Sequence, residues 1–170
     1  MLEILQKVLI GLFGCALIFF PITYRMMDKI RFHCQMCIRQ MDDGLLCWIE
    51  AASDLVSLDE SDPGKVSEYA LLTQAYRETR AGKTEEKVRL ANDAYEMVRR
   101  ASIGCYGDPR ARTLHEKLAG LYSDISILAD DYNENAKKLN EQLESGFSGF
   151  LGKVFFFRQQ PLLEDLTALI

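Results

Sequence analysis

LHEKLAGLYSDISILADDYNENAKKLNEQL, residues 114–143, is the stretch of sequence that decides the fold class. Its apolar residues recur in steps of three and four: Leu114, Leu118, Leu121, Ile125, Leu128, Tyr132, Ala136, Leu139 and Leu143. This spacing places them on one helical face, and its persistence predicts bundle or coiled-coil packing. Asp108-Pro109 is a helix-start signal, so we expect a long helix from Pro109 to Ser145.

Three further helices are predicted before this one, and no strand pattern of comparable quality appears. The first begins near Asp28 and has one apolar face: Ile30, Cys34, Cys37, Met41, Leu45, Trp48, Ala52 and Leu55. The second runs from about Val66 to Arg80, and the third starts at Thr84 and is broken at residues 104–107. Short connections make neighbouring helices antiparallel. The expected fold is all-α, an up-and-down four-helix bundle with long first and last helices.

The N-terminal segment VLIGLFGCALIFFPITY, the 17 residues Val8–Tyr24, carries no charge. As a helix it is about 26 Å long, at the short end for a transmembrane span. A signal peptide would have a shorter apolar core and a small-residue cleavage site. Lipidation at Cys15 is disfavoured because the apolar segment continues beyond it. We therefore predict a membrane anchor that includes Val8, Leu12, Leu17, Phe20 and Tyr24.

Positive charges predict the orientation of this anchor. Lys7 precedes the segment, whereas four basic residues follow it: Arg25, Lys29, Arg31 and Arg39. The positive-inside rule then places the N-terminus outside and the remaining chain in the cytoplasm, as in a single-pass inner-membrane protein. The predicted domains are residues 1–27 as the anchor, 28–158 as the bundle and 159–170 as a short tail.

The segment GFSGFLGKVFFF, residues 146–157, concentrates phenylalanines among glycines. One interpretation is that the rings cap the open end of the bundle core. The other is that they contact the membrane, because the last helix of an up-and-down bundle returns toward it. The residues of this possible membrane contact are Phe147, Phe150, Lys153, Phe155, Phe156, Phe157 and Arg158.

The segment FHCQMC, residues 32–37, raises the possibility of a thiol-based metal or redox site. Its candidate ligands are His33, Cys34, Cys37 and Cys47. Cys34 and Cys37 lie on the apolar helical face, where buried cysteines behave as small hydrophobic residues. Zinc favours four ligands, and no second Cys/His pair is present. We therefore prefer packing to metal binding, and the odd number of five cysteines suits a reducing compartment.

No catalytic constellation emerges from the remaining sequence, and we predict neither a cofactor nor an enzymatic activity. His115 is the only other histidine, and we expect it to be a solvated or half-buried bundle residue. Asp130 and Asp131 point about 100° apart on a helix, so they cannot act as one two-carboxylate site. Asn133 and Asn140, one heptad apart, are expected to set the register between helices.

The net charge of −5 and a pI of about 5.1 exclude a basic nucleic-acid surface. The partners we expect are the lipid bilayer, other membrane-associated proteins or a second copy of the chain. The favoured function is a non-enzymatic, membrane-tethered cytoplasmic scaffold or adaptor. The alternative is a thiol-based metal or redox sensor that uses Cys34 and Cys37.

Several motifs in the last third of the chain resemble a known family. They are LHEKL at residues 114–118, the pairs Tyr132-Asn133 and Leu139-Asn140, the Phe-rich segment to Phe157, and Pro161. Together they resemble the LemA family of bacterial membrane-anchored helical proteins. Asp54-Leu55-Val56 matches more loosely, and the family's Arg pair and Ile-Pro-Asn are missing there. The resemblance implies an N-terminal span and a cytoplasmic helical bundle. It implies no catalytic residues and no settled molecular function.

Overall fold

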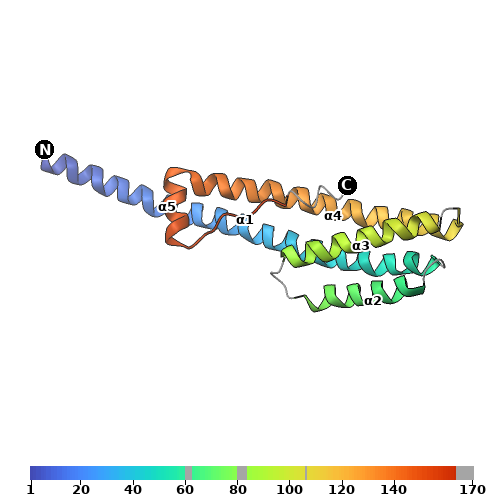
Figure 1. Ribbon diagram of the computed structural model, residues 1–170. Helices are drawn as coiled ribbons and strands as arrows, with labels where there is room; N and C mark the ends of the chain where they lie inside the picture. Colours follow the sequence, from blue (N-terminus) through green and yellow to red (C-terminus); the bar gives the residue numbers. More distant parts are fainter. Residues whose placement is uncertain (60–62, 80–83, 106, 164–170) are drawn as a thin grey trace. The chain divides into compact units, whose positions relative to one another are not determined.

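The computed structural model describes residues 1–59, 63–79, 84–105 and 107–163, all of which are helical or lie in connections and turns (Figure 1). The side chains of residues 2, 5, 8, 9, 12, 13, 15–17, 63, 84 and 85 lie outside this description. The helices are α1 (Leu2–Leu58), α2 (Pro63–Glu78), α3 (Thr84–Gly104), α4 (Pro109–Glu144) and α5 (Gly146–Val154). The prediction of an all-α protein is confirmed for the described residues.

The long last helix was predicted to within one residue, because its start has a strong local determinant. Asp108 Oδ1 accepts a hydrogen bond of 2.8 Å from the backbone N–H of Arg110, as an N-cap does. Pro109 then occupies the first helical position, where its missing N–H costs nothing. None of the nine residues of the predicted apolar face of α4 is exposed.

The first helix differs from the prediction. It begins at Leu2 instead of near Asp28, so the uncharged segment and the first bundle helix are one continuous element. Pro21 lies inside it, where proline removes one backbone hydrogen bond without ending this helix. The sequence also gave no indication of α5, because its three glycines disfavour a helix interior.

Among the described residues, no helix is long and apolar enough to cross a membrane. Three of the predicted anchor side chains, those of Val8, Leu12 and Leu17, lie outside the described residues. Of the other two, Phe20 is exposed and Tyr24 is partly buried.

The chain divides into two compact units. The first unit contains Met1–Cys37 and Asp131–Leu162, and the second contains Ile38–Asp130 and Leu163. Each unit therefore takes one end of α1 and one end of α4. The predicted domain boundaries after residues 27 and 158 stay predictions.

The core of the first unit lies where α1, α4 and the segment after α5 meet. Met27, Leu139 and Phe157 are buried there, and the side chains packed around them are Tyr24, Ile30, Leu143 and Phe155. Gly152 permits the close approach of α5, since a Cβ at this position would clash with Leu143 and lie 3.5 Å from Met27 Cε. The stricter requirement is at Gly149, where a Cβ would lie 2.5 Å from the backbone carbonyl oxygen of Leu143, whereas the Leu143 side chain near Gly152 can move.

The core of the second unit is built around aromatic side chains with satisfied hydroxyl groups. The Tyr69 hydroxyl donates a hydrogen bond of 3.0 Å to the Ile49 carbonyl. The Tyr76 hydroxyl donates one of 3.0 Å to Asp42 Oδ1, which also accepts from Lys87 Nζ at 2.6 Å. These bonds join α1, α2 and α3 without leaving the buried phenols unpaired.

Candidate functional site

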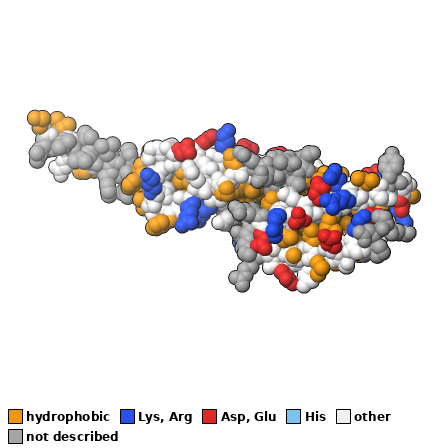
Figure 2. Space-filling view, in the orientation of Figure 1, with side chains coloured by type: hydrophobic (Ala, Val, Ile, Leu, Met, Phe, Trp, Pro, Cys, Tyr) orange, Lys and Arg blue, Asp and Glu red, His pale blue; other side chains and the backbone are white. Residues whose placement is uncertain are grey.

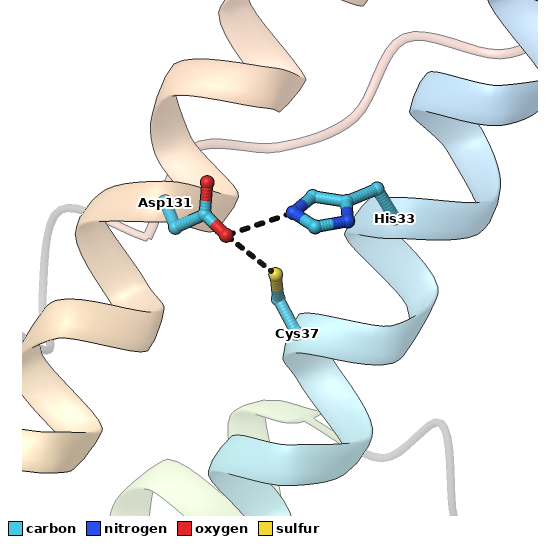
Figure 3. A group of neighbouring side chains, drawn as sticks. All are labelled: His33, Cys37 and Asp131. Carbon is cyan, nitrogen blue, oxygen red and sulfur yellow. Dashed lines mark hydrogen bonds and ion pairs between the residues drawn. The ribbon is translucent and has the colours of Figure 1, made fainter.

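Helices α1 and α4 bring three potential ligand side chains together in the first unit. His33 and Cys37 are four residues apart on α1, so they lie one above the other on the same helical face. Asp131 reaches them from α4 (Figure 3). The imidazole nitrogen, the sulfur and a carboxylate oxygen all lie within 4.8 Å of one another. Among the described residues, this is the one group of three or more such side chains.

Hydrogen bonds orient the carboxylate at the centre of this cluster. His33 Nε2 and Cys37 Sγ both donate to Asp131 Oδ2, at 2.8 and 3.5 Å. Asn135, one turn further along α4, donates from Nδ2 to Asp131 Oδ1 at 2.9 Å. One oxygen is thus held by Asn135, and the other faces α1.

Burial and these hydrogen bonds shift the pKa values within the cluster. The hydrogen bond from His33, reinforced by those from Cys37 and Asn135, lowers the pKa of Asp131, although partial burial opposes the shift. Burial, followed by the hydrogen bond to Asp131, raises the pKa of Cys37 to about 11. Burial also raises the pKa of the neighbouring Cys34 thiol. At neutral pH the carboxylate is therefore ionised and both thiols are protonated.

This arrangement does not fit nucleophilic catalysis. In a nucleophile–base pair, the histidine contacts the nucleophile and the carboxylate orients the histidine. Here the carboxylate lies between the other two groups, and Cys37 donates to it directly. A catalytic cysteine also needs a lowered pKa, whereas that of Cys37 is raised. The three groups instead offer one nitrogen, one sulfur and one oxygen as potential metal ligands.

The structure changes the ligand set that the sequence suggested. His33 and Cys37 are brought together, but buried Cys34 is not part of the cluster. Cys47 is exposed, lies in the second unit and belongs to no such group among the described residues. Asp131 was missed because it lies 98 residues from His33 in the sequence. One sequence feature could have indicated that Asp131 lies near another helix: it directly precedes Tyr132, a residue of the apolar face of α4.

The phenylalanines at the end of the chain fall into two groups. In the first group, the Phe155 ring lies edge-on to Phe20 and Tyr24, with ring centroids 5.3 and 4.9 Å apart. Phe157 is buried, and the Arg31 guanidinium lies 4.9 Å from its ring centroid. The prediction of a membrane contact is therefore wrong for Phe157, which completes the core of the first unit.

The second group of phenylalanines is presented to solvent. The exposed fractions are 48% for Phe147, 63% for Phe150 and 86% for Phe156. Lys153 and Arg158 are exposed as well. Figure 2 shows hydrophobic side chains beside Lys and Arg side chains in this part of the molecule. Core packing thus accounts for Phe155 and Phe157, and the membrane contact stays a prediction for the exposed residues.

The end of α5 places Phe156 in an unusual backbone conformation. Its φ angle is 57°, in the left-handed region that glycine favours. The N–H of Phe157 donates to the Gly152 carbonyl at 2.9 Å, and the N–H of Phe156 donates to the Lys153 carbonyl at 3.4 Å. These two bonds form a Schellman motif, whose left-handed position is usually glycine. Here that position carries a large exposed ring.

Two residues of the family resemblance hold the segment that follows α5. The Tyr132 hydroxyl donates to the Pro161 carbonyl at 2.9 Å, and the Asn140 side chain bonds to the backbone of Gln160. The expectation that Asn140 sets the register between helices is therefore wrong. Its amide pairs with the backbone of a segment that is not helical, so the N–H and C=O groups there have no partners within a helix.

The second unit contains a hollow beside His115. Its volume is about 340 Å³, and its lining includes Trp48, Tyr95 and Tyr122. His115 is exposed on α4, in agreement with the expected solvated or half-buried histidine. Among the described residues, His115 belongs to no group of three or more His, Cys, Asp or Glu side chains that could hold a metal ion.

Comparison of the chain with protein-family models, curated proteins and solved structures finds no match.

Proposed function

We propose that this protein is a membrane-tethered helical scaffold, with a second membrane contact on α5. Its span would be at the N-terminal end of α1, where seven side chains of residues 8–17 lie outside the described residues on which the search for a spanning helix rests. One observation carries the proposal. Phe155, which directly follows α5, packs against Phe20 and Tyr24 at the end of the uncharged segment Val8–Tyr24. The exposed phenylalanines are thereby held at the level where a span would leave the bilayer.

The direction of α5 supports this proposal. Figure 1 shows α5 lying across α1. If α1 crosses a bilayer, a helix that lies across it runs along the membrane surface, where interfacial amphipathic helices bind. Phe147 and Phe150 then offer rings to the acyl boundary, and Lys153 meets anionic headgroups.

The charges around the uncharged segment support an orientation with the N-terminus outside. Three basic residues, Arg25, Lys29 and Arg31, closely follow the segment. Among residues 1–7, which precede it, Lys7 is the one basic side chain. By the positive-inside rule, the rest of α1 after Tyr24 and the helices α2 to α5 are cytoplasmic at an inner membrane. Tyr24 lies where interfacial aromatic residues are enriched.

The proposed architecture of the cytoplasmic part is an up-and-down four-helix bundle, as in a divergent member of the LemA family. The sequence resemblance supports this architecture. Tyr132, Asn140 and Pro161 belong to the resembling motifs, and the side chains of Tyr132 and Asn140 bind the segment that contains Pro161. Long helices offer extended faces to other membrane proteins or to a second copy. We therefore propose a non-enzymatic scaffold role.

A fractionation experiment tests the tether. The full chain should stay with membranes after alkaline carbonate extraction, which removes peripheral proteins. A variant that lacks residues 2–17 should be extracted, because the seven residues left of the uncharged segment are too few to span a bilayer. It keeps Phe20, Tyr24 and Met27, which pack in the first unit. Extraction of the full chain would contradict the tether, as would retention of the shortened variant.

Lipid quenching tests the second contact in the full chain. A tryptophan is placed at position 150 or 156 in a Trp48→Phe background, and the protein is reconstituted in anionic vesicles with nitroxide-labelled lipids. We expect quenching at both positions, since both native rings are exposed. Tryptophan at position 127, which is also exposed, is the control and should stay unquenched. Equal quenching at all three positions, or none, would contradict the contact.

Two further measurements test orientation and the scaffold role. Protease added to intact spheroplasts should leave the chain after Tyr24 uncut. If the protease digests this part of the chain while a cytoplasmic marker protein survives, the proposed orientation is wrong. Crosslinking in intact cells followed by mass spectrometry should recover a membrane-associated protein or a second copy. Recovery of neither would contradict the scaffold.

The alternative of a thiol redox sensor receives little support. Redox-sensing cysteines are accessible and have lowered pKa values. Cys34 and Cys37 are 1% and 2% exposed, and burial raises the pKa of both. The metal-binding half of that alternative has a stronger basis in the cluster of Figure 3.

A further inference from the structure

We propose that His33, Cys37 and Asp131 form a binding site for a borderline divalent metal ion such as Zn²⁺. Their ligand atoms converge within 4.8 Å, from two helices that are packed together in the first unit. Two ligands separated by four residues on a helix bind one ion from the same face, a spacing that other helical zinc sites use. Asp131 supplies the third ligand from the opposite helix.

The two ligand separations that involve Asp131 can be compared with those of a tetrahedral ion, and the His33–Cys37 separation lies within 4.8 Å. With metal–ligand bonds of about 2.0 to 2.3 Å, tetrahedral ligand atoms lie about 3.3 to 3.6 Å apart. The sulfur-to-oxygen distance between Cys37 and Asp131 is already 3.5 Å. The nitrogen-to-oxygen distance between His33 and Asp131 is 2.8 Å and must widen. That movement is open to His33, whose side chain is 52% exposed.

The carboxylate already has the support that metal ligands commonly receive. Asn135 binds Asp131 Oδ1 and leaves Oδ2 directed at both other ligands. Such second hydrogen bonds fix the orientation of a ligand, and their loss weakens metal affinity. The amide of Asn135 is thus a positioning group for the site.

The ligand types select the class of ion. A thiolate and an imidazole favour Zn²⁺ and its neighbours over Mg²⁺ and Ca²⁺, which prefer oxygen ligands. On binding, the ion replaces the Cys37 thiol proton, which leaves to water, and no electron is transferred. Three protein ligands leave one coordination position, which the exposed side of His33 and Asp131 opens to water or a small ligand.

Cobalt binding to the full chain in mild detergent tests the site. Co²⁺ added to the metal-free protein should produce one equivalent of thiolate-to-cobalt charge-transfer absorption, and Zn²⁺ should displace it. Cys37→Ser should abolish this band. His33→Gln and Asp131→Asn should each weaken affinity about 10-fold or more, and Asn135→Ala should weaken it to a smaller extent.

Matched controls use the same residue types outside the cluster. Cys47→Ser and His115→Gln remove an exposed thiol and an exposed imidazole from the second unit, and both should leave affinity unchanged. Because Cys37 is buried, His33→Gln is the decisive variant: its side chain is half exposed, so the helical unfolding transition should be retained. No saturable band, a band lost in Cys47→Ser, or unchanged affinity in His33→Gln would overturn the proposal.

Discussion

The side chain of Asn140 pairs with the backbone of Gln160 through two hydrogen bonds. Asn140 Nδ2 donates to the Gln160 carbonyl, and the Gln160 N–H donates to Asn140 Oδ1, both at 2.8 Å. An amide side chain carries its donor and its acceptor on separate atoms, so it can make both bonds at once. The pair fastens the segment after α5 to α4, next to buried Leu139.

Replacement of Asn140 by alanine should release this segment. Loss of both bonds is expected to cost about 1 to 3 kcal/mol, since two partly buried backbone groups lose their partners. Trypsin cleavage after Arg158 should then become about 10-fold faster or more, as measured by mass spectrometry of the fragments. Gln160→Ala is the matched control, because it keeps the backbone that Asn140 binds. Equal cleavage rates in the two variants would contradict this role.

Leu139→Ala should strongly destabilise the first unit. Leu139 is fully buried against Met27 and Phe157, and truncation of a buried leucine costs about 2 to 5 kcal/mol. Ile127→Ala, at a 63% exposed position on the same helix, should cost less than about 0.5 kcal/mol. Urea unfolding in mild detergent, followed by circular dichroism, measures both. Similar losses for the two variants would mean that the assigned core is wrong.

Phe156→Gly should stabilise the fold and weaken the proposed membrane contact. Glycine adopts the φ of 57° without strain, and the exposed ring contributes little burial, so we expect a gain of about 1 kcal/mol. Phe156→Val should be less stable than the parent chain, because a β-branched residue is poorly suited to this conformation. Thermal unfolding gives the order of stability. A destabilised glycine variant would show that the ring supports the fold.

Alkaline pH should lower the stability. Burial raises the pKa of Cys37 to about 11 and that of Tyr132 to about 12, from ordinary values of 9.0 and 10.0. The folded state therefore holds these protons more tightly than the unfolded state. The resulting stabilisation is complete below about pH 9 and is lost progressively up to about pH 12.

Urea unfolding between about pH 8 and about pH 11 measures this loss. Tyr132→Phe removes one of the two groups and should make the decrease shallower above about pH 10. A pH-independent free energy of unfolding over this range would contradict the assigned burial of Cys37 and Tyr132.

Local sequence patterns determined most of the helical segments, although not α5 or the start of α1. A helix repeats every 3.6 residues, so the apolar face of α4 and the start at Asp108-Pro109 depend on neighbours within a few positions. The uncharged character of Val8–Tyr24 is likewise a property of one continuous segment. Such features need no knowledge of which helices meet.

Tertiary structure alone decided the candidate sites. Asp131 meets His33 only because α1 and α4 pack in one rotation and register, which the periodicity of each helix leaves open. The division of the phenylalanines into buried Phe157 and exposed Phe156 follows from the left-handed turn that ends α5 and redirects the chain onto α1. Contacts between distant segments depend on how helices pack against one another and on how each helix ends. Local periodicity determines neither the packing geometry nor the direction of the chain after a helix end.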